Sequence, residues 1–599
     1  MKLVKFTKIL FITATTVFLF IGTANADSMG QKELLFIDPQ FDPENQTTES
    51  ATLRHISDRA YFYIADNHWD RLSDSRRTSI LNDIGSLAAE FDNRIYPIER
   101  QFFGSEPNPG IDNNPRITLF LTNLIDNAGG YYDTTNQYSR RLVPQSNERE
   151  IIYLNVDAIN EQRKIFGFLA HEFQHMISYN EKELLRNSED DIWLNELRSE
   201  YAVTLLGYND EYAGSSIERR LSHFIKEPYD SLTEWKNLSP DYAHIALFGQ
   251  YLAEQSSLNV IAGTLKNNLP GIRSINESLK QNGFNKNFLE IYGSWLLANI
   301  VNDRAQNPAF GFSRDKLSDF TVKPNNTLQD LGNDNTFEIT DILKDWSPGW
   351  HEIFSFRTGP GQDDSDILKI EFNSSSLSSF RVIFLTVDAE GTLSVEKFEP
   401  SADNYTAYFS GVNERFNKIV IMPFKKDRLS GFGSNEVPVD FIFSLRRLDA
   451  LPDGISALNE VADILTTPAE IPGSEFPLFK PTSVKQFPNG SLIRARGDVK
   501  VYVINDGWRR HIVSPEIFNF YPHLGFDKVI EVEPDVINSY KESRLIRYAL
   551  DKKVYEIENT TSKRWLNITP EQFSYSGRSW DSIFIVNDLE LKYYKSTNY

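Results

Sequence analysis

His171-Glu172-Phe173-Gln174-His175 is an H-E-x-x-H sequence in the most apolar helical stretch of its region. Apolar residues recur around it at helical spacing, at Ile165, Leu169, Phe173, Met176 and Ile177. At ~100° per residue, the two histidines lie about 40° apart on one face of the predicted helix. They can therefore bind one metal ion, while Glu172 on the neighbouring flank can take a proton from water at the metal. The alternative reading, two helix-surface histidines with a charged neighbour, fits such an apolar helix poorly.

A metal held by two histidines needs a third protein ligand, because two bind zinc weakly. A second amphipathic helix is predicted downstream over 191–206, with Asp190 or Asp191 as its cap. Glu196 and Glu200 lie one turn apart on one of its faces, and the apolar residues beside them predict a largely buried helix. Buried carboxylates need a compensating charge, which a metal or a metal-bound histidine supplies. We therefore assign Glu196 as the third ligand and Glu200 as the acceptor for the free ring nitrogen of His171.

H-E-x-x-H followed by N-E-x-x-S-[DE] resembles the gluzincin metallopeptidases, the clan of thermolysin and the zinc aminopeptidases. Within this clan, Trp193-Leu194-Asn195-Glu196 and the segments 129–132 and 147–154 are similar to the hyicolysin-type secreted bacterial proteases. The resemblance covers about residues 50–300. It implies a thermolysin-like catalytic domain that hydrolyses peptide bonds with zinc. One departure is Leu197, where such proteins usually carry Gly, and it concerns the packing beside the ligand.

The resemblance also points to a group that stabilises the transition state. Tyr242-Ala243-His244 opens a predicted helix over 243–256 that contains the pair Tyr251-Leu252. Zinc aminopeptidases have a similar helix, whose opening Tyr stabilises the oxyanion and precedes a Tyr-Leu pair by the same nine residues. This resemblance implies the same role for Tyr242. His244 is the alternative, because thermolysin uses a His here, and an ordinary Tyr at a helix start also remains open.

The rest of the chain predicts a multidomain protein. Residues 1–26 have the basic start, apolar stretch and small-residue cleavage site of a signal peptide. Residues 27–340 form the predicted metallopeptidase domain. Strands are expected over 54–64 and 116–121 and a helix over 77–91, and further helices over 161–180, 191–206, 243–256 and 286–301, a pattern typical of an α+β domain.

Three further segments follow the predicted catalytic domain. Short β-branched and aromatic runs over 341–447 (367–372, 380–387, 418–422 and 439–445) predict an all-β sandwich. Residues 448–485 contain five prolines and form a predicted linker. Leu492-Ile493-Arg494 recurs as Leu545-Ile546-Arg547, so 486–543 and 544–599 are interpreted as two tandem small β-rich repeats.

Composition excludes several classes of function. The chain has 62 Lys+Arg against 83 Asp+Glu, a formal net charge of −21, and no basic run, which argues against binding nucleic acid or an anionic membrane surface. It contains no cysteine, so disulfides, thiolate metal sites and thiol nucleophiles are excluded. No stretch after the predicted signal is apolar enough to span a membrane. We expect a secreted protein, extracellular or in the cell envelope.

These features predict a secreted zinc-dependent endopeptidase that acts on proteins or peptides. His171, His175 and Glu196 would hold zinc, Glu172 would be the general base for water activated there, and Tyr242 the oxyanion donor. Segment 129–132 is a candidate edge strand for an extended substrate. Because all these residues lie before 245, we expect the repeats to be dispensable for hydrolysis.

The rival hypothesis is a non-catalytic cell-surface or scaffold protein. It would act through the sandwich and the repeats, which could bind a cell-surface or polymer ligand. Asp363, Asp364 and Asp366 could bind calcium, although such a loop cluster is more often solvated. The other histidines have no ligand-type spacing: His55, His68, His223, His351, His511 and His523.

Overall fold

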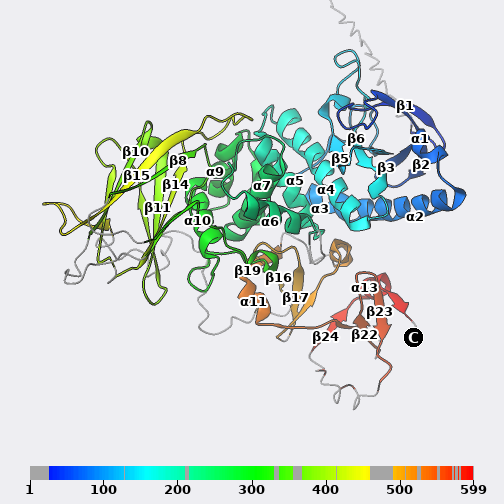
Figure 1. The fold of residues 1–599 in the computed structure, drawn as a ribbon. Coiled ribbons are helices and arrows are strands. Elements are labelled where there is room, and N and C mark those ends of the chain that lie inside the picture. Colours follow the sequence, from blue (N-terminus) through cyan, green and yellow to red (C-terminus); the bar gives the residue numbers. More distant parts are fainter. Residues whose placement is uncertain are drawn as a thin grey trace, which may run out of the picture.

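A computed structural model describes most of the chain. The described residues are 26–126, 128–209, 215–329, 336–354, 367–412, 415–458, 487, 490–505, 507–521, 528–548, 553–568, 573, 578 and 582–597. The predicted signal peptide up to residue 25, the linker from 459 to 485, and the acidic cluster at Asp363, Asp364 and Asp366 lie outside them. In Figure 1 a sheet (blue) and a sandwich (yellow-green) lie at opposite ends of a helical block, and two small sheets (orange to red) lie below.

The N-terminal part is built on a six-stranded sheet. Its order is β1 (Lys32–Phe36), β2 (Thr48–Ile56), β3 (Ala60–Ala65), β4 (Ile117–Thr122), β6 (Ile151–Asn155) and β5 (Gly130–Tyr132). Strands β3, β4 and β6 are parallel, and β5 runs antiparallel to β6 at the sheet edge. The three parallel strands are buried throughout because apolar side chains cover both faces of the sheet.

The strand expected over 54–64 is two strands in the structure. A turn at residues 57–59 separates β2 from β3, and the two strands pair antiparallel. The carboxylate of Asp92 stabilises this turn, since it accepts hydrogen bonds from the backbone amides of Asp58 and Arg59. The hydrophobic pattern continues across the turn, which is why it did not reveal the break. The strand expected over 116–121 corresponds to β4.

Helices pack on this sheet and extend beyond it. After α1 (Asp66–Asp70) come α2 (Asp74–Glu90), α3 (Tyr96–Phe103) and α4 (Gln162–Ser178), and Phe173 of α4 packs against the rings of Phe91 and Tyr96. The helical block contains α5 (Ile192–Leu205), α6 (Ser216–Lys226), α7 (Ser239–Gln255), α8 (Leu258–Gly263), α9 (Gly271–Gln281) and α10 (Phe288–Val301). The expected helices correspond to α2, α4, α5, α7 and α10, whereas the remaining helices were not expected.

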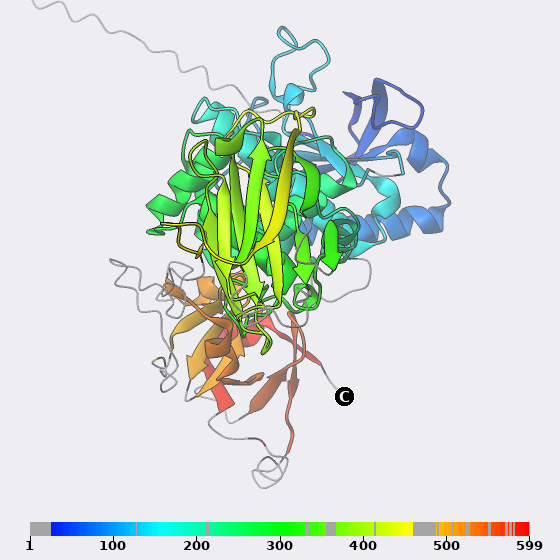
Figure 2. The same cartoon turned by 60° about the vertical axis from the view of Figure 1, so that its left-hand side comes forward.

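Two sheets form the sandwich (Figure 2). One has the order β13 (Thr406–Ser410), β10 (Ile367–Ser374), β15 (Val439–Leu448) and β8 (Phe337–Leu343). The other has the order β12 (Leu393–Phe398), β11 (Phe380–Val387), β14 (Lys418–Lys425), β9 (His351–Phe354) and β7 (Asn326–Gln329). Apolar side chains from both sheets share one core rich in phenylalanine. Because β7 and the start of β8 precede residue 341, the strands of the sandwich begin earlier than the expected boundary.

The C-terminal region contains two sheets of identical strand order. One is β19 (Val529–Val532), β16 (Leu492–Ala495), β17 (Val501–Asn505), β18 (Trp508–His511) and β20 (Lys541–Glu542). The other is β24 (Ile583–Val586), β21 (Leu545–Tyr548), β22 (Val554–Ile557), β23 (Ser562–Trp565) and β25 (Lys595–Thr597). A hydrophobic cluster contains residues from both sheets, and a buried ion pair joins Arg510 to Glu590. The two units are therefore one packed body.

Among the residues that the structure describes, none of the helices combines the length and the apolar character needed to cross a membrane.

Candidate metal centre

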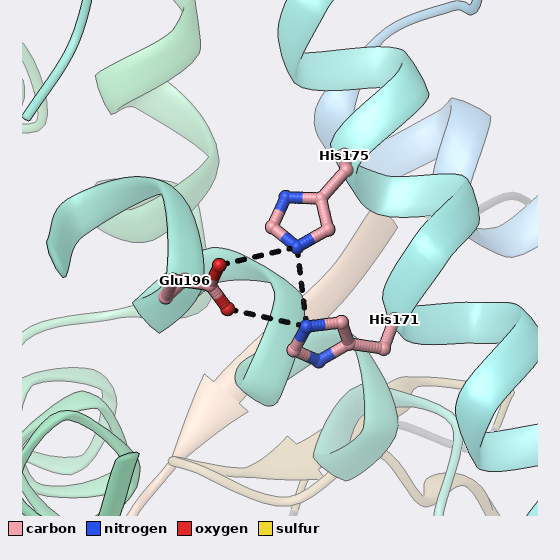
Figure 3. Close-up of side chains that lie close together, drawn as sticks. All are labelled: His171, His175 and Glu196. Atoms are coloured by element: carbon pink, nitrogen blue, oxygen red, sulfur yellow. Dashed lines mark hydrogen bonds and ion pairs between the residues drawn. The ribbon is translucent and has the colours of Figure 1, made fainter. Parts of the chain in front are cut away.

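His171, His175 and Glu196 converge between α4 and α5 (Figure 3). Nε2 of His171 lies 3.1 Å from Nε2 of His175 and 3.2 Å from Oε2 of Glu196. Nε2 of His175 lies 3.6 Å from Oε1 of Glu196. One donor atom from each of the three side chains lies within 4.8 Å of the others. The three residues expected to be ligands thus form one cluster, although they come from two separate helices.

This cluster fits a zinc ion. Two ligand atoms, each about 2.0–2.1 Å from a tetrahedral zinc, stand about 3.3 Å from each other. The three distances in the cluster scatter around that value. Two imidazoles and one carboxylate are also donors that zinc accepts, and three protein ligands leave the fourth position for water or substrate.

Ser199 fixes the ring of His175. Its hydroxyl oxygen lies 3.1 Å from Nδ1 of His175 and 2.6 Å from Oε1 of Gln174. The hydroxyl donates its one proton to Gln174, and its oxygen then accepts from Nδ1–H of His175. This arrangement leaves the lone pair of Nε2 free to face the metal position.

Glu200 lies beside His171, but its main partner is another residue. Oε1 of Glu200 is 3.8 Å from Nδ1 of His171, which is too far for a hydrogen bond. The carboxylate instead accepts hydrogen bonds from Nε and Nη2 of Arg220 on α6, with the Nε contact at 3.3 Å. The structure therefore departs from the expectation that Glu200 is the direct acceptor for His171. Glu200 and Arg220 form a buried ion pair next to the ring.

The electrostatics of the three ligands are mutually dependent. Burial would lower the pKa of His171, but its contact with Glu196 and the nearby carboxylates of Glu172 and Glu200 raise that pKa to about 9. Burial would raise the pKa of Glu196, but the two imidazoles lower it well below its usual value. Without a metal, the cluster therefore holds a proton on His171 and a negative charge on Glu196. A divalent cation would replace that proton.

A cavity of about 770 Å³ opens beside the cluster, and β5 forms one of its walls. Glu172 lines it, and burial raises the pKa of this carboxyl group above its usual value. The backbone here is tightly packed at two glycines, Gly129 just before β5 and Gly130 at its start, against Phe168 of α4 and Tyr153 of β6 respectively. A Cβ atom on Gly129 would lie 2.5 Å from the ring of Phe168, and one on Gly130 would lie 2.8 Å from the carbonyl oxygen of Tyr153. Glycine at these two positions allows this segment to pack against both β6 and α4, the helix that carries the histidines.

Of the two candidates for the oxyanion donor, only Tyr242 lines this cavity. Its hydroxyl donates to Oδ1 of Asn237 at 2.9 Å, and the guanidinium of Arg220 lies over its ring at 4.5 Å. Burial and the nearby carboxylates of Glu196 and Glu200 raise the pKa of Tyr242, so the phenol keeps its proton. His244 is fully buried, and its ring nitrogens lie 3.0 and 3.1 Å from the carbonyl oxygens of Pro240 and Pro228. It faces away from the metal position.

Sequence reasoning missed two residues of this site. Ser199 is part of the N-E-x-x-S-[DE] pattern, so its position was visible although its contact with His175 was not. Arg220 lies on α6, whose apolar residues Ile217 and Phe224 recur at helical spacing. That spacing could have predicted the helix. Nothing in the sequence places its arginine between Glu200 and Tyr242.

Comparison with known proteins gives one sequence match. No family model matches the chain. Over 238 residues the chain is 30% identical to the neutral metalloprotease ShpI of Staphylococcus hyicus, an alignment that covers 36% of this chain and 49% of that protein. The chain thus spans about half the length of the curated relative that it matches.

Solved structures add no argument about the fold. A periplasmic inhibitor of g-type lysozyme from Aeromonas hydrophila (7% identity) and a mitogen from Yersinia pseudotuberculosis (8%) each match 20% of this chain at a TM-score of 0.14, covering 99% and 92% of those chains. Tomato aspermy virus (10%) also matches 20%, at a TM-score of 0.11, covering 81% of its chain. Such low scores carry no structural inference. The sequence match to the neutral metalloprotease supports a relationship to metalloproteases.

Proposed function

We propose that the chain is a secreted zinc-dependent peptidase that hydrolyses internal peptide bonds of proteins or peptides. The observation that carries this proposal is the convergence of His171, His175 and Glu196 on one wall of a cavity that Glu172 and Tyr242 also line. The sequence match to a metalloprotease supports it independently.

The residues of the site have separate roles in this proposal. A bound zinc ion would lower the pKa of a water molecule beside it and polarise the carbonyl group under attack. Glu172 accepts the proton of that water and transfers it to the leaving amine, a role that suits a buried carboxylate whose pKa is raised. The neutral phenol of Tyr242 would turn its one proton from Asn237 to the developing oxyanion and donate a hydrogen bond to it. Arg220 holds Glu200 in place and lies over the ring of Tyr242.

Strand β5 would bind the substrate backbone. It forms the edge of the six-stranded sheet and pairs with β6 on one side only. An extended peptide in the cavity could pair with its other side, which would place a carbonyl group near the metal position. Binding an extended segment through its backbone favours cleavage within chains.

Replacement of Glu172 by Gln tests the proposal. The variant keeps the size of the side chain but cannot accept the proton, so zinc content should stay near one per chain while turnover of a peptide library falls by about 10²–10⁴-fold. Glu277→Gln is the matched control, because it makes the same change on α9, where the carboxylate accepts from Gln281. Zinc-loaded protein that cleaves no peptide, or a Glu172→Gln variant with unchanged turnover, would contradict the proposal.

A further inference from the structure

The loop between β14 and β15, residues 426–438, extends from the sandwich to the helical block (Figure 1, in yellow). Three backbone or ring N–H groups outside the loop donate to its carbonyl oxygens. Trp346 Nε1 donates to Arg428 at 2.7 Å, Ile272 N to Leu429 at 2.9 Å, and Trp235 N to Gly433 at 3.0 Å. We call this segment the β14–β15 loop.

The loop contacts the N-cap residue of α5. Asp191 directly precedes this helix, yet its side chain makes no capping bond to it. Its Oδ1 instead accepts a hydrogen bond from the backbone N–H of Gly431 at 2.7 Å. Gly271, at the start of α9, packs directly against the same carboxylate. A Cβ atom there would lie 2.0 Å from Oδ2 of Asp191 and 3.0 Å from the carbonyl oxygen of Leu429.

An aromatic contact lies two residues nearer the metal ligand. Phe432 of the loop meets the edge of Trp193, with ring centroids 6.5 Å apart and ring planes at 80°. Trp193 is fully buried and precedes Glu196 by three residues, so its position sets the rotation of the first turns of α5. Both contacts act on the part of the helix that carries the third ligand.

The same loop also contacts a second residue that lines the cavity. Trp235, whose N–H donates to Gly433, lines the cavity and meets the ring of Tyr242 at 4.9 Å. Glu436 makes the loop rigid, because its carboxylate accepts from Nη1 of Arg428 at 2.6 and 2.8 Å and from the N–H of Gly433 at 2.9 Å. One rigid segment therefore contacts both α5 and the neighbour of Tyr242.

We propose that the β14–β15 loop is part of the framework of the metal centre and that its contacts with Asp191 and Trp193 position Glu196. Metal ligands must lie within about 0.2 Å of their ideal distances, so a small shift of α5 would reduce affinity. The affinity for zinc would then depend on a loop of the sandwich, far along the chain from the ligands. The inference uses the metal centre of the proposed function but not its peptidase activity.

The test uses the full chain with Asp191→Ala and Phe432→Ala as variants. Asp191→Asn keeps an oxygen that can accept from Gly431. Asp388→Ala is the matched control, because the carboxylate of Asp388 also accepts backbone N–H groups, from Glu390 and Thr392, in a turn of the same sandwich. Zinc dissociation constants are measured by competition with a chromophoric chelator. Amide hydrogen exchange over 192–196 is followed in the metal-free protein.

We expect the two disruptive variants to weaken zinc binding by about tenfold or more, as loss of support for a ligand does, and to speed exchange over 192–196. Asp191→Asn and Asp388→Ala should stay within about threefold of the unsubstituted protein. Combining Asp191→Ala with Phe432→Ala should weaken binding by less than the product of the single effects, because both act through one loop.

Unchanged zinc affinity and unchanged exchange in Phe432→Ala would overturn the inference, as would an equal loss in Asp388→Ala. Should Asp191→Ala fail to fold, Phe432→Ala carries the test. If the variants lose zinc as expected but no form of the protein cleaves peptides, the proposed function fails while the positioning role stands. If no form binds zinc, the exchange measurement alone decides the positioning of α5.

Discussion

Ser199 determines which nitrogen of His175 can face a metal, because its oxygen accepts from Nδ1–H. Replacing Ser199 by Ala removes that acceptor and leaves the imidazole free to change tautomer. We expect zinc affinity to fall by about 10–100-fold, the usual effect of losing a partner of a metal ligand. A competition titration with a chelator measures it.

The matched control for this change is Ser178→Ala. Ser178 also contacts Gln174, with its Oγ 2.9 Å from Nε2, but its hydroxyl makes no hydrogen bond to the ring of His175. Its replacement should therefore leave zinc affinity within about threefold. An equal loss in both variants would mean that Gln174, and not the imidazole tautomer, controls the site.

Tyr242 should act in the transition state and not in metal binding. Tyr242→Phe removes the hydroxyl that donates to Asn237 and keeps the ring under Arg220. We expect kcat to fall by about 10²–10³-fold with little change in KM or in zinc content. Tyr229→Phe, which removes a hydroxyl that donates to the carbonyl of Lys323, is the control. A kcat that falls less than about threefold would remove Tyr242 from the mechanism.

Zinc uptake should release a proton. Contact with Glu196 and the nearby carboxylates raises the pKa of His171 to about 9 in the metal-free protein, so the ring is protonated at neutral pH. A zinc ligand must be neutral, and binding near pH 7.5 should therefore release about one proton. Apparent affinity should rise with pH and level off above about pH 9. Calorimetry in buffers of different ionisation enthalpy counts the proton, and Glu196→Gln, which removes the charged partner, should lower the pH at which affinity levels off.

The residues of the cluster could be predicted from the sequence, but their partners could not. Spacing along one helix places His171 and His175 together, and a second helix with paired carboxylates supplies a candidate third ligand. Whether Glu200 binds His171 or Arg220 depends on α6, which a segment outside the described residues separates from α5. Tertiary contacts of this kind leave no periodic signal in the sequence.

At the scale of elements, the close packing of β5 against β6 gives a test of stability. Gly130→Ala would place a Cβ atom 2.8 Å from the carbonyl oxygen of Tyr153, a backbone atom that cannot turn aside. We expect the free energy of unfolding to fall by about 1–3 kcal/mol, as overpacking typically causes. Chemical denaturation measures the change.

Gly85 in α2 provides the opposite case. A Cβ atom there would meet no other atom within 4 Å. Gly85→Ala should therefore raise the free energy of unfolding by up to about 1 kcal/mol, because alanine favours a helix. If Gly130→Ala were equally stabilising, β5 would not be packed against β6 as closely as the structure describes.

The elements that the sequence predicted are those with a long hydrophobic pattern. Long apolar stripes gave α4, α5, α7 and α10, and runs of β-branched residues gave β11, β14 and β15. The short turn between β2 and β3 was missed because the apolar pattern continues across it. Helix α6 alternates a narrow apolar face with charged residues, and α8 has only six residues, so neither stands out from a connecting segment.

Over the whole molecule, the helical block and the sandwich share one hydrophobic core. Trp346 and Trp350, which come from the sandwich side, are buried with Tyr292 and Trp295 of α10. The hydroxyl of Tyr292 donates to the carbonyl of Trp346 at 2.7 Å, and Nε1 of Trp350 donates to that of Leu296 at 3.2 Å. The packing therefore makes the two sides of the predicted boundary near residue 340 one unit.

The C-terminal sheets also contact α3 and the helical block. Arg494 lies over the ring of Phe102 at 5.7 Å, and an ion pair joins Arg304 to Glu533 at 4.0 Å. A Cβ atom on Gly497 would lie 2.8 Å from Cγ of Glu254. Contacts therefore cross between the repeats and the helices, and these three involve no residue that lines the metal cavity.

Truncation distinguishes the two boundaries. A chain that ends at Leu458 keeps the shared core and should retain zinc and keep kcat/KM within about threefold, with a lower Tm because the contacts of the repeats are lost.

A chain that ends at Asn325 loses Trp346, Trp350 and Phe424 from the core. Each large side chain stabilises the fold by about 1.5–3 kcal/mol, so the loss of about 5–9 kcal/mol is comparable to the whole stability of a domain, about 5–15 kcal/mol. The shorter chain should therefore neither fold nor bind zinc.

Thermal unfolding, zinc content and cleavage of one short peptide, measured on both chains, decide the question. A shorter chain that folds and holds zinc would place the whole site in the N-terminal half, and a longer chain that loses tenfold in kcat/KM with zinc intact would bring the repeats into the substrate groove.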